Sequence, residues 1–194
     1  MYGWSPQYPL SALTVSGTAA KYGINNTPTD PAVLANLSRV SDFLATLPFT
    51  FRIGSGYRSP EVNQRVGGAG QSQHMQGEAV DFTPLNATNE DVANWLYQNH
   101  PDHPELDQVI WYTDTGHVHV SVGGRRRGEF LKGTKEGSSY IPWAPTYTGQ
   151  AQMAGRFLYN RPFQTALWTV TTASVVLVAA NYLFGKKPPQ RALR

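Results

Sequence analysis

The fold of this chain is constrained most by two short β-rich runs, each of which carries a potential metal ligand. The first run, residues 79–82, contains Asp81 and follows a glycine-rich loop with His74. The second run, residues 117–122, begins about 35 residues later and carries His119. Two imidazoles and one carboxylate are the donor set of catalytic zinc sites that keep a fourth position open for water. The fold must therefore bring the loop and both runs together, and we expect one zinc ion held by these three side chains.

Two further β-rich runs are predicted from their alternation of apolar and polar residues, at positions 49–53 and 107–112. The second of them is separated from the run with His119 by a short turn that ends in glycine, which is typical of a hairpin. Successive side chains of a strand point to opposite faces, so His117 and His119 are predicted to share one face. Both imidazoles can therefore point into the same pocket.

Helices are predicted around these strands from the spacing of apolar residues. The clearest one starts at Asp30, which can cap it, with Pro31 at the first helical position. Together with the strands, the helices indicate an α+β domain. The predicted helices cover residues 11–22, 31–47, 60–66 and a segment from Asn86 or Thr88 to about Asn99.

Composition and charge narrow the range of partners. The net charge of +3 is small, but much of the basic surplus lies in residues 125–127 and in the last nine residues. This favours an acidic polymer or a membrane surface as neighbour. No nucleic-acid-binding motif is present, so no nucleic-acid partner is expected. The lack of cysteine excludes disulfides and thiolate metal sites.

The composition changes after residue 122, first to Gly, Arg, Lys and Ser and then to a stretch rich in Pro and aromatic residues. Residues 163–184 follow without a charge, and their length of about 33 Å as a helix suffices to span a membrane. A buried or interface-bound amphipathic helix is the alternative. More basic residues lie after this segment than before it, which predicts a cytoplasmic tail, and no cleaved signal peptide is expected at the start. The predicted organisation is a catalytic domain at 1–124, a linker at 125–161, a transmembrane helix at 162–185 and a basic tail at 186–194.

Three motifs in fixed order carry a family resemblance. They are Ser-Gly-Tyr-Arg-Ser at 55–59, Ser-x-His-x-x-Gly-x-Ala-x-Asp at 72–81 and His-x-His-Val-Ser at 117–121. In this order they resemble the zinc D-alanyl-D-alanine carboxypeptidase superfamily, which includes lysostaphin-type enzymes and the hedgehog fold. The resemblance covers roughly residues 10–122, and the lead-in at 18–28 is similar to its phage and bacterial branch. It implies a central antiparallel sheet, a zinc ligand set and a substrate peptide bond in bacterial peptidoglycan.

The resemblance also suggests which group handles protons. Many carboxypeptidases of the family carry an acidic residue three positions before the last histidine ligand, but this chain has Gly116 there. His117 instead fits the His-x-His pattern of the related endopeptidases, in which the first histidine is a base or a transition-state donor. Asp114 is the alternative base.

Three more residues are expected at the site. Arg58 would stabilise a developing oxyanion or hold a substrate carboxylate, although a structural ion pair is the alternative. Ser72 and Tyr57 are expected to contact the substrate. Ser72 is expected to orient the loop or the substrate by hydrogen bonding and not to act as a nucleophile, so a serine mechanism is not expected.

Two hypotheses about function follow. The first is a zinc peptidase that cuts peptidoglycan stem peptides, as an endopeptidase or a DD-carboxypeptidase, anchored in a membrane and acting on the cell wall. A phage particle, with the domain in its membrane or capsid, would be one way of delivering it. The second is a catalytically silent structural or virion membrane protein of the same fold. Gly116 keeps the second hypothesis open, whereas the complete ligand set favours the first.

Overall fold

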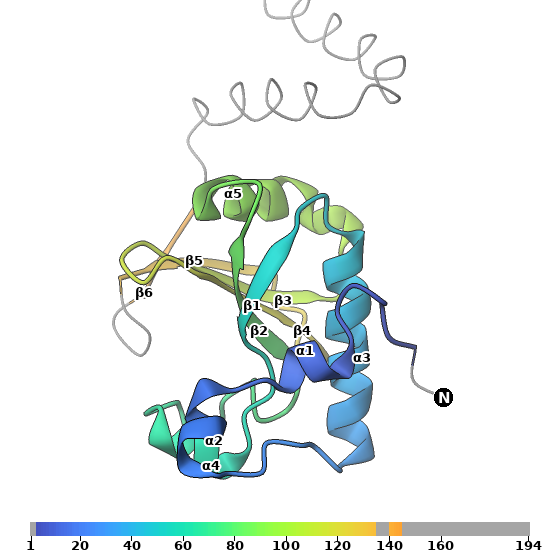
Figure 1. Cartoon of the computed structure of the whole chain (residues 1–194). Coiled ribbons are helices and arrows are strands. Elements are labelled where there is room, and N and C mark those ends of the chain that lie inside the picture. Colours follow the sequence, from blue (N-terminus) through green and yellow to red (C-terminus); the bar gives the residue numbers. More distant parts are fainter. Residues whose placement is uncertain (1–2, 135–139, 145–194) are drawn as a thin grey trace, which may run out of the picture. The chain divides into compact units, whose positions relative to one another are not determined.

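The computed structural model describes residues 3–134 and 140–144, and within them one six-stranded sheet has the strand order β1-β2-β4-β3-β5-β6 (Figure 1). The first four strands in this order pair antiparallel, but β3 and β5 run parallel. The α+β class is therefore confirmed, whereas the sheet is mixed and not purely antiparallel. The strands are β1 (Phe51–Ser55), β2 (Ala79–Pro84), β3 (Leu106–Tyr112), β4 (Val118–Val122), β5 (Glu129–Gly133) and β6 (Tyr140–Pro142).

The N-terminal helix predicted at residues 11–22 is two helices, α1 (Leu10–Thr14) and α2 (Gly17–Tyr22). Ser16 interrupts them with an extended backbone, and its hydroxyl accepts a hydrogen bond from the amide of Ala19. A serine that caps a following helix in this way cannot also continue the preceding one. The end of α2 is as predicted, because Gly23 takes the left-handed conformation with a φ of 65°.

The two long helices begin where their capping residues predict. Asp30 accepts a hydrogen bond from the amide of Ala32 at the start of α3 (Pro31–Thr46). Thr88, and not Asn86, caps α5 (Asn89–Asn99), and it forms a capping box with Asp91. The short helix α4 (Pro60–Arg65) and the 3-10 turn η1 (His100–Asp102) complete the set.

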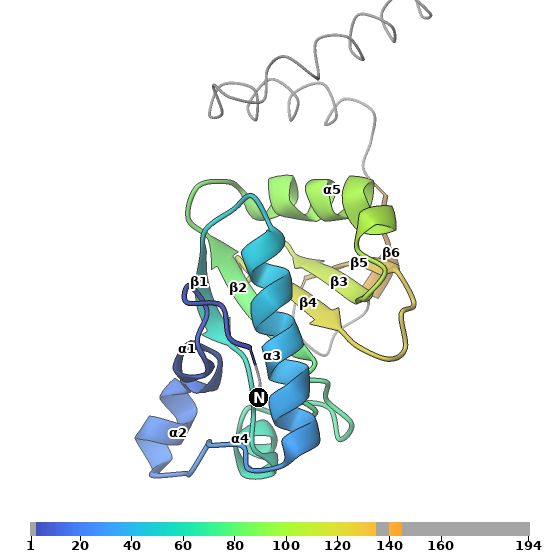
Figure 2. The ribbon, with the colours of Figure 1, turned by 90° about the vertical axis from the view of Figure 1, so that its right-hand side faces the viewer.

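One face of the sheet forms the hydrophobic core with these helices. Val118 and Val120 of β4 are fully buried and point away from the face that carries His119. Both α3 and α5 contact the central strands β2 and β4 (Figure 2). The apolar stripe of α3, including Leu37 and Leu44, is fully buried. The opposite face of the sheet is thereby left to carry the polar side chains of the site.

The sheet continues beyond residue 124, where the sequence predicted a linker. Strand β5 pairs with β3 and β6 pairs with β5, and the amide of Trp143 donates to the carbonyl of Phe130. The predicted membrane segment at 162–185 and the basic tail at 186–194 lie outside the described residues. None of the helices in the described ranges is long and apolar enough to cross a membrane.

Candidate metal centre

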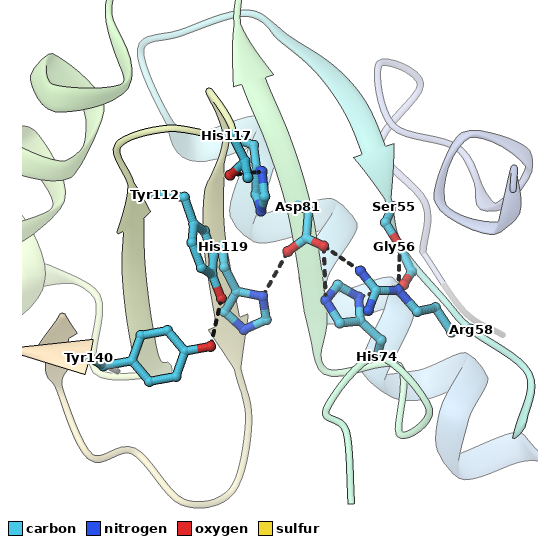
Figure 3. Close-up of polar contacts among 10 residues, drawn as sticks. Ser55, Gly56, Arg58, His74, Asp81, Tyr112, His117, His119 and Tyr140 are labelled. Carbon is cyan, nitrogen blue, oxygen red and sulfur yellow. Dashed lines mark hydrogen bonds and ion pairs between the residues drawn. The ribbon is translucent and has the colours of Figure 1, made fainter. Parts of the chain in front are cut away.

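The three predicted metal ligands lie together on the face of the sheet opposite the hydrophobic core (Figure 3). Asp81 of β2 and His119 of β4 are direct partners across the antiparallel pair, and Asp81 Oδ1 lies 2.8 Å from Nδ1 of His119. His74, from the loop between α4 and β2, places its Nε2 3.2 Å from Asp81 Oδ2. All three side chains are buried, and their potential ligand atoms lie within 4.8 Å of one another.

The chemistry of this cluster fits a metal ion. Nδ1 of His74 lies 2.7 Å from the carbonyl oxygen of Gly56, which can only accept, so Nδ1 carries the proton. The other nitrogen, Nε2, is buried without a hydrogen-bond partner among the described residues and presents a lone pair toward Asp81. Metal-bound histidines almost always donate their other ring N–H to a carboxylate, a backbone carbonyl or water. His74, Asp81 and His119 would together hold one zinc ion.

Asp81 is ionised in this environment. Burial pushes the pKa of Asp81 upward, but its interactions with the neighbouring imidazoles of His74 and His119 outweigh burial and hold the pKa well below its usual range. The carboxylate is therefore in the form that binds metals at neutral pH.

Arg58 also contacts this carboxylate. Its Nη2 lies 2.6 Å from Asp81 Oδ2, its Nε donates to the hydroxyl of Ser55 at 2.8 Å, and its amide donates to the carbonyl of His74. Arg58 is itself buried. The observed contact is the ion pair that was the structural alternative for this residue. A role of Arg58 toward a substrate stays a prediction.

His117 directly precedes β4 on the same face as His119. Its carbonyl accepts a hydrogen bond from the amide of Tyr112 on β3, and the two rings lie against each other with centroids 4.5 Å apart and planes tilted by 34°. Nδ1 of His117 lies 3.0 Å from the hydroxyl of Thr115, whereas Nε2 is buried with no hydrogen-bond partner in the part of the chain that the structure describes. The alternative base, Asp114, is exposed on the turn between the strands.

The two predicted substrate-binding residues shape the loops around the ligands. The backbone of Ser72 makes turns with Ala69 and Met75, which lead into the loop that carries His74. The amide of Tyr57 donates to the carbonyl of Leu13. Burial raises the pKa of the Tyr57 phenol, and the negative charge of Asp30 adds to this shift. Direct contact of Ser72 or Tyr57 with a substrate stays a prediction.

A buried carboxylate beside the site was missed from the sequence. Asp107 of β3 accepts hydrogen bonds from the amide, Nε and Nη2 of Arg127 at 2.8 to 3.0 Å. It also accepts from Gln73 at 2.7 Å and from the hydroxyl of Ser121 at 3.4 Å. Gln73 precedes His74, so Asp107 ties the ligand-bearing loop to β4. The signal in the sequence was an acidic residue at the start of an apolar run, together with the arginine cluster at 125–127.

The pKa of Asp107 reflects these contacts. Burial pushes this pKa upward, but hydrogen bonds from Arg127 and Gln73 and the charge of Arg127 lower it to about 2. The carboxylate is thus charged over the whole range in which a hydrolase of neutral pH would work.

The comparison with known families agrees with this geometry. The model of the family described as Peptidase M15 matches residues 6–121, more than half of the chain. The match contains the metal cluster, Arg58 and His117, and it ends within β4. No curated protein matches the sequence. Peptidases of the M15 family are zinc-dependent, and His74, Asp81 and His119 form a possible site for that metal. The chain therefore belongs to the peptidase M15 family, the family of the zinc D-alanyl-D-alanine carboxypeptidases.

Proposed function

We propose that this protein is a zinc-dependent endopeptidase that cuts peptide bonds in the stem peptides of bacterial peptidoglycan. The observation that carries the proposal is the buried cluster of His74, Asp81 and His119, in which Nε2 of His74 lacks a hydrogen-bond partner among the described residues. A buried nitrogen lone pair is costly unless something binds it. A single zinc ion held by these three residues would meet that need.

Each residue of the site has a defined task in this proposal. Zinc, when bound, would supply a Lewis acid for the scissile carbonyl and a lowered pKa for an attacking water. His117 would take the proton of that water at Nε2 and deliver it to the nitrogen of the leaving amine. Arg58 is paired with Asp81 and would add positive charge where the oxyanion develops.

The absence of an acidic side chain at position 116 favours cleavage inside the peptide over removal of a terminal residue. Gly116 has a φ of 70° and carries no carboxylate, so the proton-transfer role falls on His117, as in the endopeptidases that share the His-x-His motif. This part of the proposal rests on the resemblance and on the buried Nε2 of His117.

Digestion of purified peptidoglycan by the zinc-loaded full chain tests the proposal. Mass spectrometry of the products should find new amine and carboxylate ends inside stem peptides. Release of a terminal D-alanine alone would make the protein a carboxypeptidase. If peptidoglycans of several chemotypes yield no new ends, the enzymatic function is wrong and a silent structural domain takes its place.

Membrane anchoring through residues 163–184, with delivery by a phage particle, is the proposed route to the wall. The support is the uncharged run and its basic flanks in the sequence. Carbonate extraction of membranes from expressing cells should leave the full-length protein in the pellet. Recovery in the soluble fraction would remove the anchor from the proposal without affecting the peptidase.

A further inference from the structure

A second row of side chains lies on the same face of the sheet as the metal ligands. In the register of the sheet, His119 lies opposite Ile110 of β3. Two residues further along β3, Tyr112 lies opposite Gly133 of β5, and Gly133 lies opposite Tyr140 of β6. Cross-strand partners share a face, as do residues two apart in one strand. Tyr112 and Tyr140 are therefore on the face of His119, one step along the strands from the ligands.

This row is connected by side-chain contacts that end at His117. The hydroxyls of Tyr140 and Tyr112 lie 3.1 Å apart, and their rings meet edge to face. Tyr112 in turn stacks on the imidazole of His117 (Figure 3). Tyr112 is buried with 2% of its surface exposed, whereas Tyr140 is 36% exposed. A continuous chain of contacts thus runs from the edge strand β6 to the proposed proton-transfer group.

Gly133 makes this arrangement possible. A Cβ atom at this position would lie 2.8 Å from Cδ1 of Tyr140 and 3.5 Å from Cδ1 of Tyr112. The Tyr140 ring therefore passes directly over the glycine backbone and reaches Tyr112. With a side chain at position 133, the partly exposed Tyr140 ring would have to move outward.

His117 depends on such contacts for its orientation. The imidazole lies at the start of β4, and its Nδ1 is held by Thr115 on an exposed turn. The Tyr112 ring is buried, and its centroid lies 4.5 Å from that of the imidazole with the two planes tilted by 34°. Proton transfer requires the catalytic nitrogen to lie within hydrogen-bond reach of the proton, and a misplacement of about 1 Å can cost about 100-fold in rate.

We propose that Tyr140 is a positioning residue of the active site, which holds Tyr112 and, through it, the imidazole of His117. This inference rests on the proposed function of His117. It extends the active site to β6, which lies outside residues 6–121 matched by the family model. Tyr140 acts through another residue and does not itself transfer a proton.

A double-mutant cycle on the zinc-loaded full chain tests this inference. Tyr140→Phe removes only the hydroxyl and should lower kcat about tenfold, with KM and zinc content unchanged. In a His117→Ala background the same change should have no further effect, because the group that Tyr140 positions is gone. Tyr22→Phe, an exposed tyrosine on α2, is the matched control and should leave kcat unchanged. An equal loss in both backgrounds, or no loss in either, would overturn the inference.

Gly133→Ala provides a second variant that removes no hydroxyl. It should displace Tyr140 and lower kcat to a similar extent, again only while His117 is present. A readout without activity is the NMR resonance of the His117 imidazole, identified by its loss in His117→Ala. Tyr140→Phe and Gly133→Ala should both shift this resonance, because the stacked Tyr112 ring moves. If the wild-type protein cuts no peptidoglycan, the proposed function fails, and the resonance still decides the positioning role: an unshifted signal in both variants overturns it.

Discussion

The carbonyl oxygen of Gly56 lies 2.7 Å from Nδ1 of His74, so the residue that follows β1 orients a ligand 18 positions later in the chain. Position 56 has no room for a side chain. A Cβ atom on Gly56 would lie 2.1 Å from the carbonyl oxygen of Leu13, a backbone atom of α1 that cannot move independently. The packing of α1 against β1 and the orientation of a metal ligand are therefore coupled at one glycine.

Gly56→Ala is expected to weaken zinc binding and to destabilise the fold together. Overpacking of the new methyl group against the Leu13 backbone should cost about 1–3 kcal/mol of unfolding free energy. The resulting shift should move the Gly56 carbonyl away from Nδ1 of His74 and lower zinc affinity about 10–100-fold. Urea denaturation and zinc titration measure the two effects. Gly70→Ala, at a position where a Cβ meets nothing within 4 Å, is the control. Wild-type zinc affinity in Gly56→Ala would contradict the proposed coupling.

His74→Ala, Asp81→Ala and His119→Ala should each abolish stoichiometric zinc binding. Each change removes one of the three donor atoms that lie within 4.8 Å of one another. Metal analysis of the purified variants measures the content, and circular dichroism checks that each variant is folded. Stoichiometric zinc in any two of the folded variants would show that the ligands were misassigned.

His117→Ala should keep its zinc and lose about 10²–10⁴-fold in kcat, the range typical of general acid–base groups. The metal content should be retained because Nδ1 of His117 is hydrogen-bonded to Thr115 and not to a member of the metal cluster. Asp114→Ala, on the exposed turn, distinguishes the alternative base. Loss of zinc in His117→Ala would make this histidine a ligand, and a large loss of rate only in Asp114→Ala would transfer the role to Asp114.

Asp107 should make stability depend on pH in the acid range. Its pKa is about 2 in the folded protein and near 3.8 when unperturbed, so the unfolded chain takes up a proton first as the pH falls. The carboxylate contributes its full stabilisation above about pH 4, and this is lost as the pH drops toward 2, by about 2 kcal/mol.

Urea denaturation between pH 2 and 6 measures this contribution. The free energy of unfolding of Asp107→Asn should fall less steeply over that window than the wild-type value, and it should be lower at neutral pH. Asp42→Asn, on the exposed side of α3, is the control. If Asp107→Asn and the wild type follow parallel curves, the pKa of Asp107 is not lowered by folding.

Local signals in the sequence were sufficient for the two long helices and for grouping the three potential metal ligands. Asp30 and Thr88 cap α3 and α5 through bonds to amides two or three residues away, so their effect can be read from the sequence. The ligands could be grouped because His74 and Asp81 are seven residues apart and His119 lies in an alternating apolar run.

The last two strands and the Asp107 contacts could not be read in this way. Strands β5 and β6 are short, and β6 is exposed along its length, so their sequences lack the alternation of a buried strand. They join the sheet through backbone pairing with β3 and with each other. The bond between Asp107 and Arg127 joins residues 20 positions apart across that pairing, and it becomes visible only when the strand order is known.

The pairing of Asp81 with His119 joins positions 38 residues apart, whereas β3 and β4 are joined by a short turn. Short loops close before long ones, and contacts distant in sequence generally form late in folding. We therefore expect the β3–β4 hairpin to form early. The pairing of β2 with β4 should follow once α5 has packed against the sheet. Until β2 and β4 are paired, Asp81 and His119 would not lie side by side, and a newly synthesised chain could not yet hold a metal ion. The time at which zinc is first captured would mark the completion of the sheet.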